Sequence, residues 1–195
     1  MSLYRDYYQG TDFDKSTSPH AGLFGSPYHY ENEKRTERAI LTAKTSYTCV
    51  AQVNDKLPAP ICRVSINTPP ENPFVPFAVA KLPAAYDKAL RDEYDATKMY
   101  WASTQVMALS AAYRSTLGGT IDEAVAGAER NSLRLVESSL NLPKNKFAAT
   151  LNQNAVKIFD DWKNLYTRLM IQYDGGAGLK YDERNLPAPA APTEY

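Results

Sequence analysis

The sequence predicts a mainly α protein in which three long antiparallel helices form a bundle. An extended aromatic N-terminal arm, a small β-hairpin and a proline-rich strap precede that bundle. Three observations support this fold class: apolar residues recur at steps of four and three between residues 84 and 176, seven of the 13 prolines fall in residues 58–83, and residues 1–35 show no period. We therefore divide the chain into an extended region (1–83), a helical bundle (84–176) and a C-terminal tail (177–195).

The N-terminal arm, residues 1–35, is rich in aromatic residues set among glycines and prolines. Its seven rings are Tyr4, Tyr7, Tyr8, Phe13, Phe24, Tyr28 and Tyr30. A solvated linker is poor in aromatic residues, because it has no surface to bury them against. We therefore expect these rings to dock on a surface. The sequence leaves open whether that surface belongs to the same chain or to a neighbour.

Two β-prone runs follow the arm. Residues 46–53 alternate in polarity, and residues 61–67 are rich in β-branched side chains, which predicts a loose hairpin. The proline-rich stretch at 58–83 should run as a stiff extended strap, since proline donates no backbone hydrogen bond. Phe74 and Phe77 would attach the strap to an apolar surface.

The first two helices are predicted at residues 84–117 and 120–141. Gly118 and Gly119 separate them, because glycine is unfavourable inside a helix. Thr120 and Glu123 have the spacing of a capping box, in which the threonine oxygen accepts from a first-turn amide. The second helix should therefore begin at Thr120.

The third helix is predicted at residues 144–173, after Pro143, which suits a helix start. Its apolar positions step by four and three: Phe147, Leu151, Ala155, Ile158, Trp162, Leu165 and Leu169. Gly175 and Gly176 end it. Short connections make the three helices antiparallel. The Pro/Ala-rich tail could stay unattached or could contact a protein surface through Tyr195.

The search for catalytic residues finds no recognisable motif. His20 and His29 are the only histidines, and no metal-binding spacing such as HExxH is present. Cys49 and Cys62 are expected as free thiols on the hairpin, with a bridge or a metal site as the alternative. No GxSxG, GxGxxG or GxxxxGK[ST] pattern occurs. We therefore predict no catalytic residue, no metal site and no cofactor.

Charge and hydropathy limit the partners. The 22 basic and 22 acidic residues cancel, which disfavours nucleic acid. No apolar run approaches the roughly 18–20 residues that cross a bilayer, and the first residues do not resemble a signal peptide. The expected location is the cytoplasm or a particle assembled there, without membrane contact.

These features suggest a non-catalytic structural or assembly subunit of a larger particle such as a virion, tail connector or filament. Such a subunit would be a homo-oligomer or part of a large hetero-assembly. The residues predicted to contact neighbours are Tyr4, Tyr7, Tyr8, Phe13, Phe24, Tyr28, Tyr30, Phe74, Phe77 and Tyr195. Two alternatives stay open: an adaptor that recruits one partner through the bundle, and an enzyme whose site no motif reveals.

Overall fold

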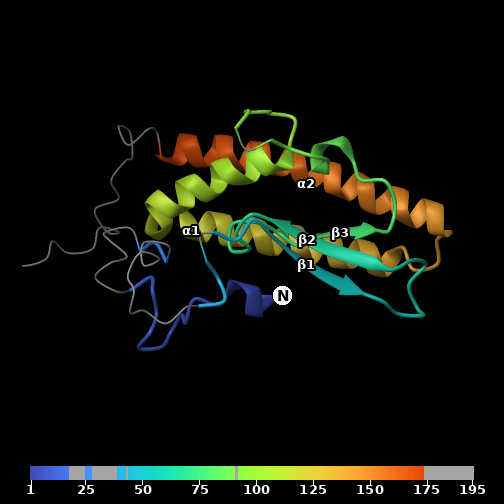
Figure 1. Cartoon of the computed structure of the whole chain (residues 1–195), viewed down its shortest axis with the longest axis horizontal. Coiled ribbons are helices and arrows are strands. Elements are labelled where there is room, and N and C mark those ends of the chain that lie inside the picture. The colour runs from blue at the N-terminus through green and yellow to red at the C-terminus, as the bar shows by residue number, and fades with distance from the viewer. Residues whose placement is uncertain (18–24, 28–38, 43, 91, 174–195) are drawn as a thin grey trace, which may run out of the picture.

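The computed structural model describes residues 1–17, 25–27, 39–42, 44–90 and 92–173 (Figure 1). These residues form a mixed α/β structure. Its elements, in chain order, are the 3-10 helix η1 (Ser2–Arg5), the strands β1 (Tyr47–Gln52), β2 (Ile61–Ile66) and β3 (Val75–Ala78), the 3-10 helix η4 (Ala84–Tyr86), and the helices α1 (Met99–Ser138) and α2 (Lys144–Tyr173).

The prediction of a mainly α bundle of three long helices is wrong. The described residues contain two long helices and a three-stranded antiparallel sheet. The first helix begins at Met99 and not at residue 84, and η4 is the only helical turn between them in this described stretch. Leu90 and Tyr94 matched the helical period but are 46% and 59% exposed, so no packing holds that segment in a helix.

The sheet has the strand order β1-β2-β3. The predicted hairpin is present as β1 and β2, which pair with Cys49 opposite Val64. A third strand, β3, lies in the segment predicted as a strap and pairs with β2 so that Phe77 is opposite Cys62. Extended backbone was therefore expected there, but its pairing with β2 was not.

Cys49 and Cys62 form a disulfide, so the expectation of free thiols is wrong. Ala51 lies opposite Cys62 in the register, which places the two cysteines on one face of neighbouring strands, with their Cα atoms 6.5 Å apart. Such a separation is in the normal range for a disulfide. The disulfide joins the edge strand β1 to the central strand β2.

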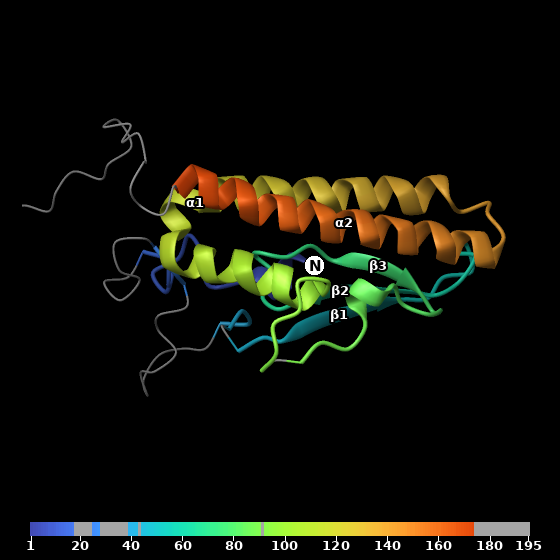
Figure 2. The same cartoon turned by 90° about the horizontal axis from the view of Figure 1, so that it is seen from above.

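Helix α1 is interrupted at Tyr113, whose φ of −140° and ψ of 39° are not helical. Figures 1 and 2 show that the part of α1 before this residue points in a different direction from the part after it. The predicted break at Gly118 and Gly119 is wrong, because both glycines lie inside the helix. Leu117 and Ile121 flank them and are both fully buried, so packing outweighs the low helix propensity of glycine.

Helix α2 spans Lys144–Tyr173, which confirms the predicted third helix. All seven positions of its predicted apolar stripe are buried, from Phe147 to Leu169. Together with Val75 and Phe77 of β3, most of this stripe forms the main hydrophobic cluster against α1. Within the described ranges, no helix is long and apolar enough to cross a membrane.

We predict that Gly119→Ala raises the free energy of unfolding by about 0.5–1 kcal/mol. A new Cβ there would meet no atom within 4 Å, and alanine favours the helical backbone. Gly118→Ala is the matched control, because its Cβ would lie 3.2 Å from Arg114 Nε and should cancel the gain. Urea unfolding measures both variants, and a loss of stability in Gly119→Ala would contradict a continuous helix here.

We also predict that the double variant Cys49→Ser, Cys62→Ser has a free energy of unfolding about 3 kcal/mol lower than that of the wild type. The disulfide joins residues 13 positions apart, and closing a loop of that size restricts the unfolded chain. The comparison is made by urea unfolding without and with a reductant. The difference should vanish under reducing conditions, and equal stability in both conditions would contradict the prediction.

Candidate functional site

The loop between β2 and β3, residues 67–74, is buried along its whole length. Loops normally run over the surface, because their backbone groups need hydrogen-bond partners. Side chains of three other elements donate to its carbonyl oxygens: Arg5 Nε to Pro69 at 2.8 Å, Ser65 Oγ to Asn72 at 3.1 Å, and Trp162 Nε1 to Glu71 at 3.2 Å. The β2–β3 loop is thus fixed by η1, β2 and α2.

Glu71 places a carboxylate inside this loop with no solvent exposure. Its Oε2 accepts a hydrogen bond from Thr68 Oγ1 at 2.7 Å, and its Oε1 accepts from Ser110 Oγ at 2.8 Å. The Arg114 guanidinium lies 3.8 Å from Oε1 and forms an ion pair with it. A buried carboxylate requires such partners, so Glu71 ties the loop to α1.

The sequence analysis missed Glu71 because it treated the proline-rich stretch as a strap. A signal was present: Glu71 is the only charged residue between Arg63 and Lys81. A single charge inside a long uncharged and buried segment needs partners from elsewhere in the fold.

Asn67 opens the loop in the left-handed region of backbone conformation, with a φ of 58°. Asparagine tolerates this region better than most residues. Its Nδ2 donates to Ser103 Oγ at 2.6 Å and to Thr104 Oγ1 at 3.0 Å. These bonds attach the start of the loop to the first part of α1.

Two arginines lie around a second carboxylate, that of Glu129 on α1. Arg5 NH2 is 2.6 Å from Glu129 Oε1, and the same oxygen accepts a hydrogen bond from Phe74 N at 2.9 Å. Burial lowers the pKa of the Arg63 guanidinium from its ordinary value, and the charge of Glu129 opposes this effect. We call Arg5, Arg63 and Glu129 the arginine cluster, which carries two positive charges and one negative charge.

Arg63 is 8% exposed, and no described carboxylate lies within 4 Å of its guanidinium. Its nitrogen atoms are nevertheless not sealed from solvent. In the described part of the chain, the sealed polar side-chain atoms without a partner are Asn72 Oδ1, Tyr86 Oη and Trp101 Nε1. The Arg63 side chain is therefore largely buried, while its guanidinium nitrogens keep some contact with solvent.

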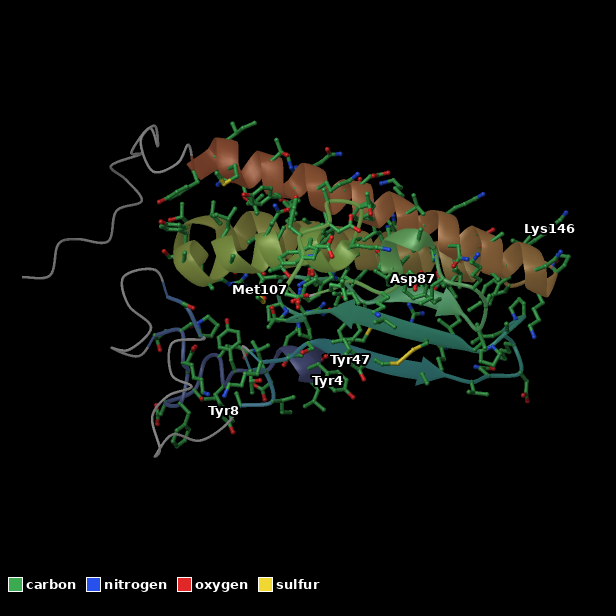
Figure 3. The ribbon with its side chains drawn as sticks, turned by 45° about the horizontal axis from the view of Figure 1, so that its top comes forward. Tyr4, Tyr8, Tyr47, Asp87, Met107 and Lys146 are labelled. Atoms are coloured by element: carbon green, nitrogen blue, oxygen red, sulfur yellow. A yellow bond between two sulfur atoms is a disulfide. The ribbon has the colours of Figure 1, made fainter. Side chains whose placement is uncertain are left out.

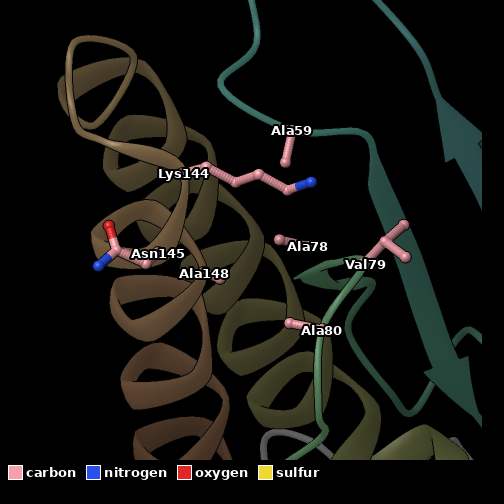
Figure 4. Close-up of a pocket in the computed structure, with 7 residues that line it drawn as sticks. All are labelled: Ala59, Ala78, Val79, Ala80, Lys144, Asn145 and Ala148. Carbon is pink, nitrogen blue, oxygen red and sulfur yellow. The ribbon is translucent and has the colours of Figure 1, made fainter.

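An open hollow of about 390 Å³ lies beside the start of α2 (Figure 4). Its lining is mainly apolar and consists of Ala59, Ala78, Val79, Ala80, Lys144, Asn145 and Ala148. Figure 4 shows the Lys144 side chain extended across it. The hollow has room for a small apolar group, but its lining holds no pair of acid and base for catalysis.

The structure describes only some of the predicted contact residues. Tyr4 and Tyr8 both lie in the N-terminal region (Figure 3). The Tyr4 ring is 6.2 Å from that of Phe74, and the Tyr8 ring is 6.2 Å from that of Phe13. Phe77 is buried against the edge of Tyr86 in the core. Tyr7 is half-buried. Outside the described residues lie Phe24, Tyr28, Tyr30 and Tyr195, together with the two histidines, His20 and His29.

Three potential nucleophiles of the described ranges, Cys49, Cys62 and Ser110, are not available to a substrate. Cys49 and Cys62 are joined in the disulfide. Ser110 and its partner Glu71 have the spacing of a nucleophile and a base, but both are fully buried and out of reach of a substrate. No group of three or more potential metal ligands occurs among the described residues.

The comparison with known protein families gives a match to the model of Peptidase family C69 over residues 2–124. The matched segment contains η1, the whole sheet, the β2–β3 loop and the first part of α1. No curated protein and no solved structure gives a significant match. The prediction of a non-catalytic structural subunit is wrong, as is the adaptor alternative, because the match is to a family of peptidases and covers more than half of the chain. The chain belongs to Peptidase family C69.

Proposed function

We propose that the protein is a peptidase that hydrolyses peptides with a free carboxylate, and that the arginine cluster binds this carboxylate. The observation that carries peptide hydrolysis is the family match over residues 2–124. The preference for a carboxylate rests on the charge and burial of Arg63. Arg5 and Arg63 both lie within the matched segment.

A guanidinium is well suited to this role. Its planar donors match the two oxygens of a carboxylate, and the resulting hydrogen bonds are strong because both partners are charged. Arg63 has no carboxylate partner among the described residues, while Arg5 is already bonded to Glu129. Burial disfavours the charged form of Arg63 and Glu129 offsets this effect only in part, so a ligand carboxylate at Arg63 would relieve the remaining cost.

The β2–β3 loop serves this site as a rigid support. Peptide hydrolysis depends on holding the substrate in a fixed orientation. Phe74 N at the end of the loop donates to Glu129, so the loop fixes the carboxylate around which both arginines lie. Glu71 is sealed from solvent and acts as a positioning residue that holds the loop against α1.

The proposed activity is tested by incubating the full chain with peptides of two to six residues and detecting new amino termini by mass spectrometry. Each peptide is supplied with a free carboxylate and as its C-terminal amide. Cleavage of the free acids in preference to the amides is expected. Absence of cleavage of every peptide would overturn the proposed function.

We predict that Arg63→Ala raises KM for a free-acid peptide about ten- to hundredfold, the effect of losing a charged hydrogen bond worth about 1.5–3 kcal/mol. KM for the amide should not change. Arg130→Ala, on an exposed position of α1, is the matched control and should leave both values unchanged. An equal loss on acid and amide would mean that Arg63 supports the fold and does not bind the substrate carboxylate.

We predict that Glu71→Gln lowers the free energy of unfolding by about 2–3 kcal/mol, because it removes a buried charge that Arg114 and two hydroxyl groups compensate. Glu137→Gln, at an exposed position of α1, is the control and should be close to neutral. Urea unfolding gives both values. A stable Glu71→Gln protein that has lost kcat would contradict a purely positioning role.

A further inference from the structure

The outer edge of β1 has backbone groups without partners. Asn67 N donates to Ser46 O at 2.8 Å, and these two residues are opposite each other when the β1–β2 register is extended by one position. Hydrogen-bonded and non-bonded pairs alternate along antiparallel strands. Thr48, Val50 and Gln52 therefore bond to β2, while three residues direct their N–H and C=O groups outward: Tyr47, Cys49 and Ala51. Within the described structure no hydrogen bond reaches these outward groups.

The other edge of the sheet is protected. Val79 N donates to Pro60 O, so the same alternation directs the backbone of Pro76 and Ala78 away from β2. Pro76 has no N–H to offer to another strand. In addition, α2 packs along β3. An incoming strand therefore finds an incomplete set of donors at β3.

The β1 edge lacks such protection. Its six residues, Tyr-Thr-Cys-Val-Ala-Gln, contain no charge, proline or glycine. Natural proteins place charged residues or proline on exposed edges to keep them from pairing, and an edge without them is a site for strand addition. Tyr47 is 67% exposed, and Figure 3 shows it on β1 at the outside of the sheet.

The outward groups are self-complementary about a two-fold axis. If the axis passes through Cys49, Tyr47 lies opposite Ala51 of the other copy, and Cys49 lies opposite its equivalent. Each of these three pairs is of the type that forms two hydrogen bonds, so all outward groups of both strands find partners. The pairing sets a large ring beside a small side chain and brings no like charges together.

We propose that β1 pairs antiparallel with β1 of a second copy of this chain, so that the two three-stranded sheets form one continuous sheet. The interface is isologous, as in most homodimers. It is independent of the proposed peptidase activity, because no residue of the arginine cluster lies on β1. The disulfide between Cys49 and Cys62 holds β1 in place for this pairing.

The test measures the oligomeric state of the full chain by sedimentation velocity from micromolar to near-millimolar concentration. The wild type should become dimeric as the concentration rises. Ala51→Pro removes an outward N–H while leaving the bonds to β2, and should weaken the dimer at least about tenfold. Ala51→Val keeps this N–H and is the matched control that should still form the dimer. Circular dichroism checks that the variants are folded.

Hydrogen exchange of the wild type, followed by NMR, gives a second readout that needs no variant. The amides of Tyr47, Cys49 and Ala51 should become protected only at the higher concentration, whereas those of Thr48 and Val50 should be protected throughout. A protein that stays monomeric at every concentration, or a dimer that forms without protecting these three amides, would overturn the proposal. A monomer that binds an added extended peptide at β1 would also overturn it, by assigning the edge to another occupant.

Discussion

The buried carboxylate of Glu71 is the interaction on which the arrangement of the sheet and the helices depends. Its oxygens accept hydrogen bonds from Thr68 in the β2–β3 loop and from Ser110 on α1, and its backbone carbonyl accepts one from Trp162 on α2. A charge sealed from water is stable only when its partners are in place. A shift of the loop relative to α1 would therefore break the bonds that stabilise this charge, and a shift relative to α2 would break the bond from Trp162.

The arginine cluster depends on this loop for its geometry. The loop presents Phe74 N to Glu129, and Glu129 in turn binds Arg5, which reaches back to the carbonyl of Pro69. These contacts link the loop to α1, α1 to η1, and η1 back to the loop. Arg63 lies on β2, the strand that leads into the loop, where burial lowers its pKa and the Glu129 charge raises it. The proposed carboxylate site is thus held in position by the fold before any ligand binds.

The sequence was informative where local pattern and burial agree. Helix α2 was predicted because seven apolar residues follow the helical period along the segment, and all seven of these positions are buried. The start of α1 was predicted wrongly, because Leu90 and Tyr94 follow the same period but are exposed. Periodicity describes a face but cannot reveal whether anything packs against it. The break at Tyr113 has no signal in composition, whereas Gly118 and Gly119 suggested a break that packing overrides.

The candidate site was beyond local reasoning for a different reason. Asn67 contacts Ser103 across 36 positions, Glu71 contacts Ser110 across 39, and Arg5 contacts Glu129 across 124. Only Glu71 had a detectable signal, as a lone charge in an uncharged stretch.

A motif search detects sites whose residues are close along the chain, because only then is their spacing fixed by one element. Many enzymes instead assemble their groups from distant segments, and unrelated folds reach one geometry with different chain orders. The absence of a motif therefore excludes local motif chemistries and says nothing about a site built by tertiary contacts. The prediction of a non-catalytic subunit was drawn from missing motifs, and this is why it was wrong. Contacts between distant residues, such as those that fix the β2–β3 loop, produce no fixed motif spacing in the sequence.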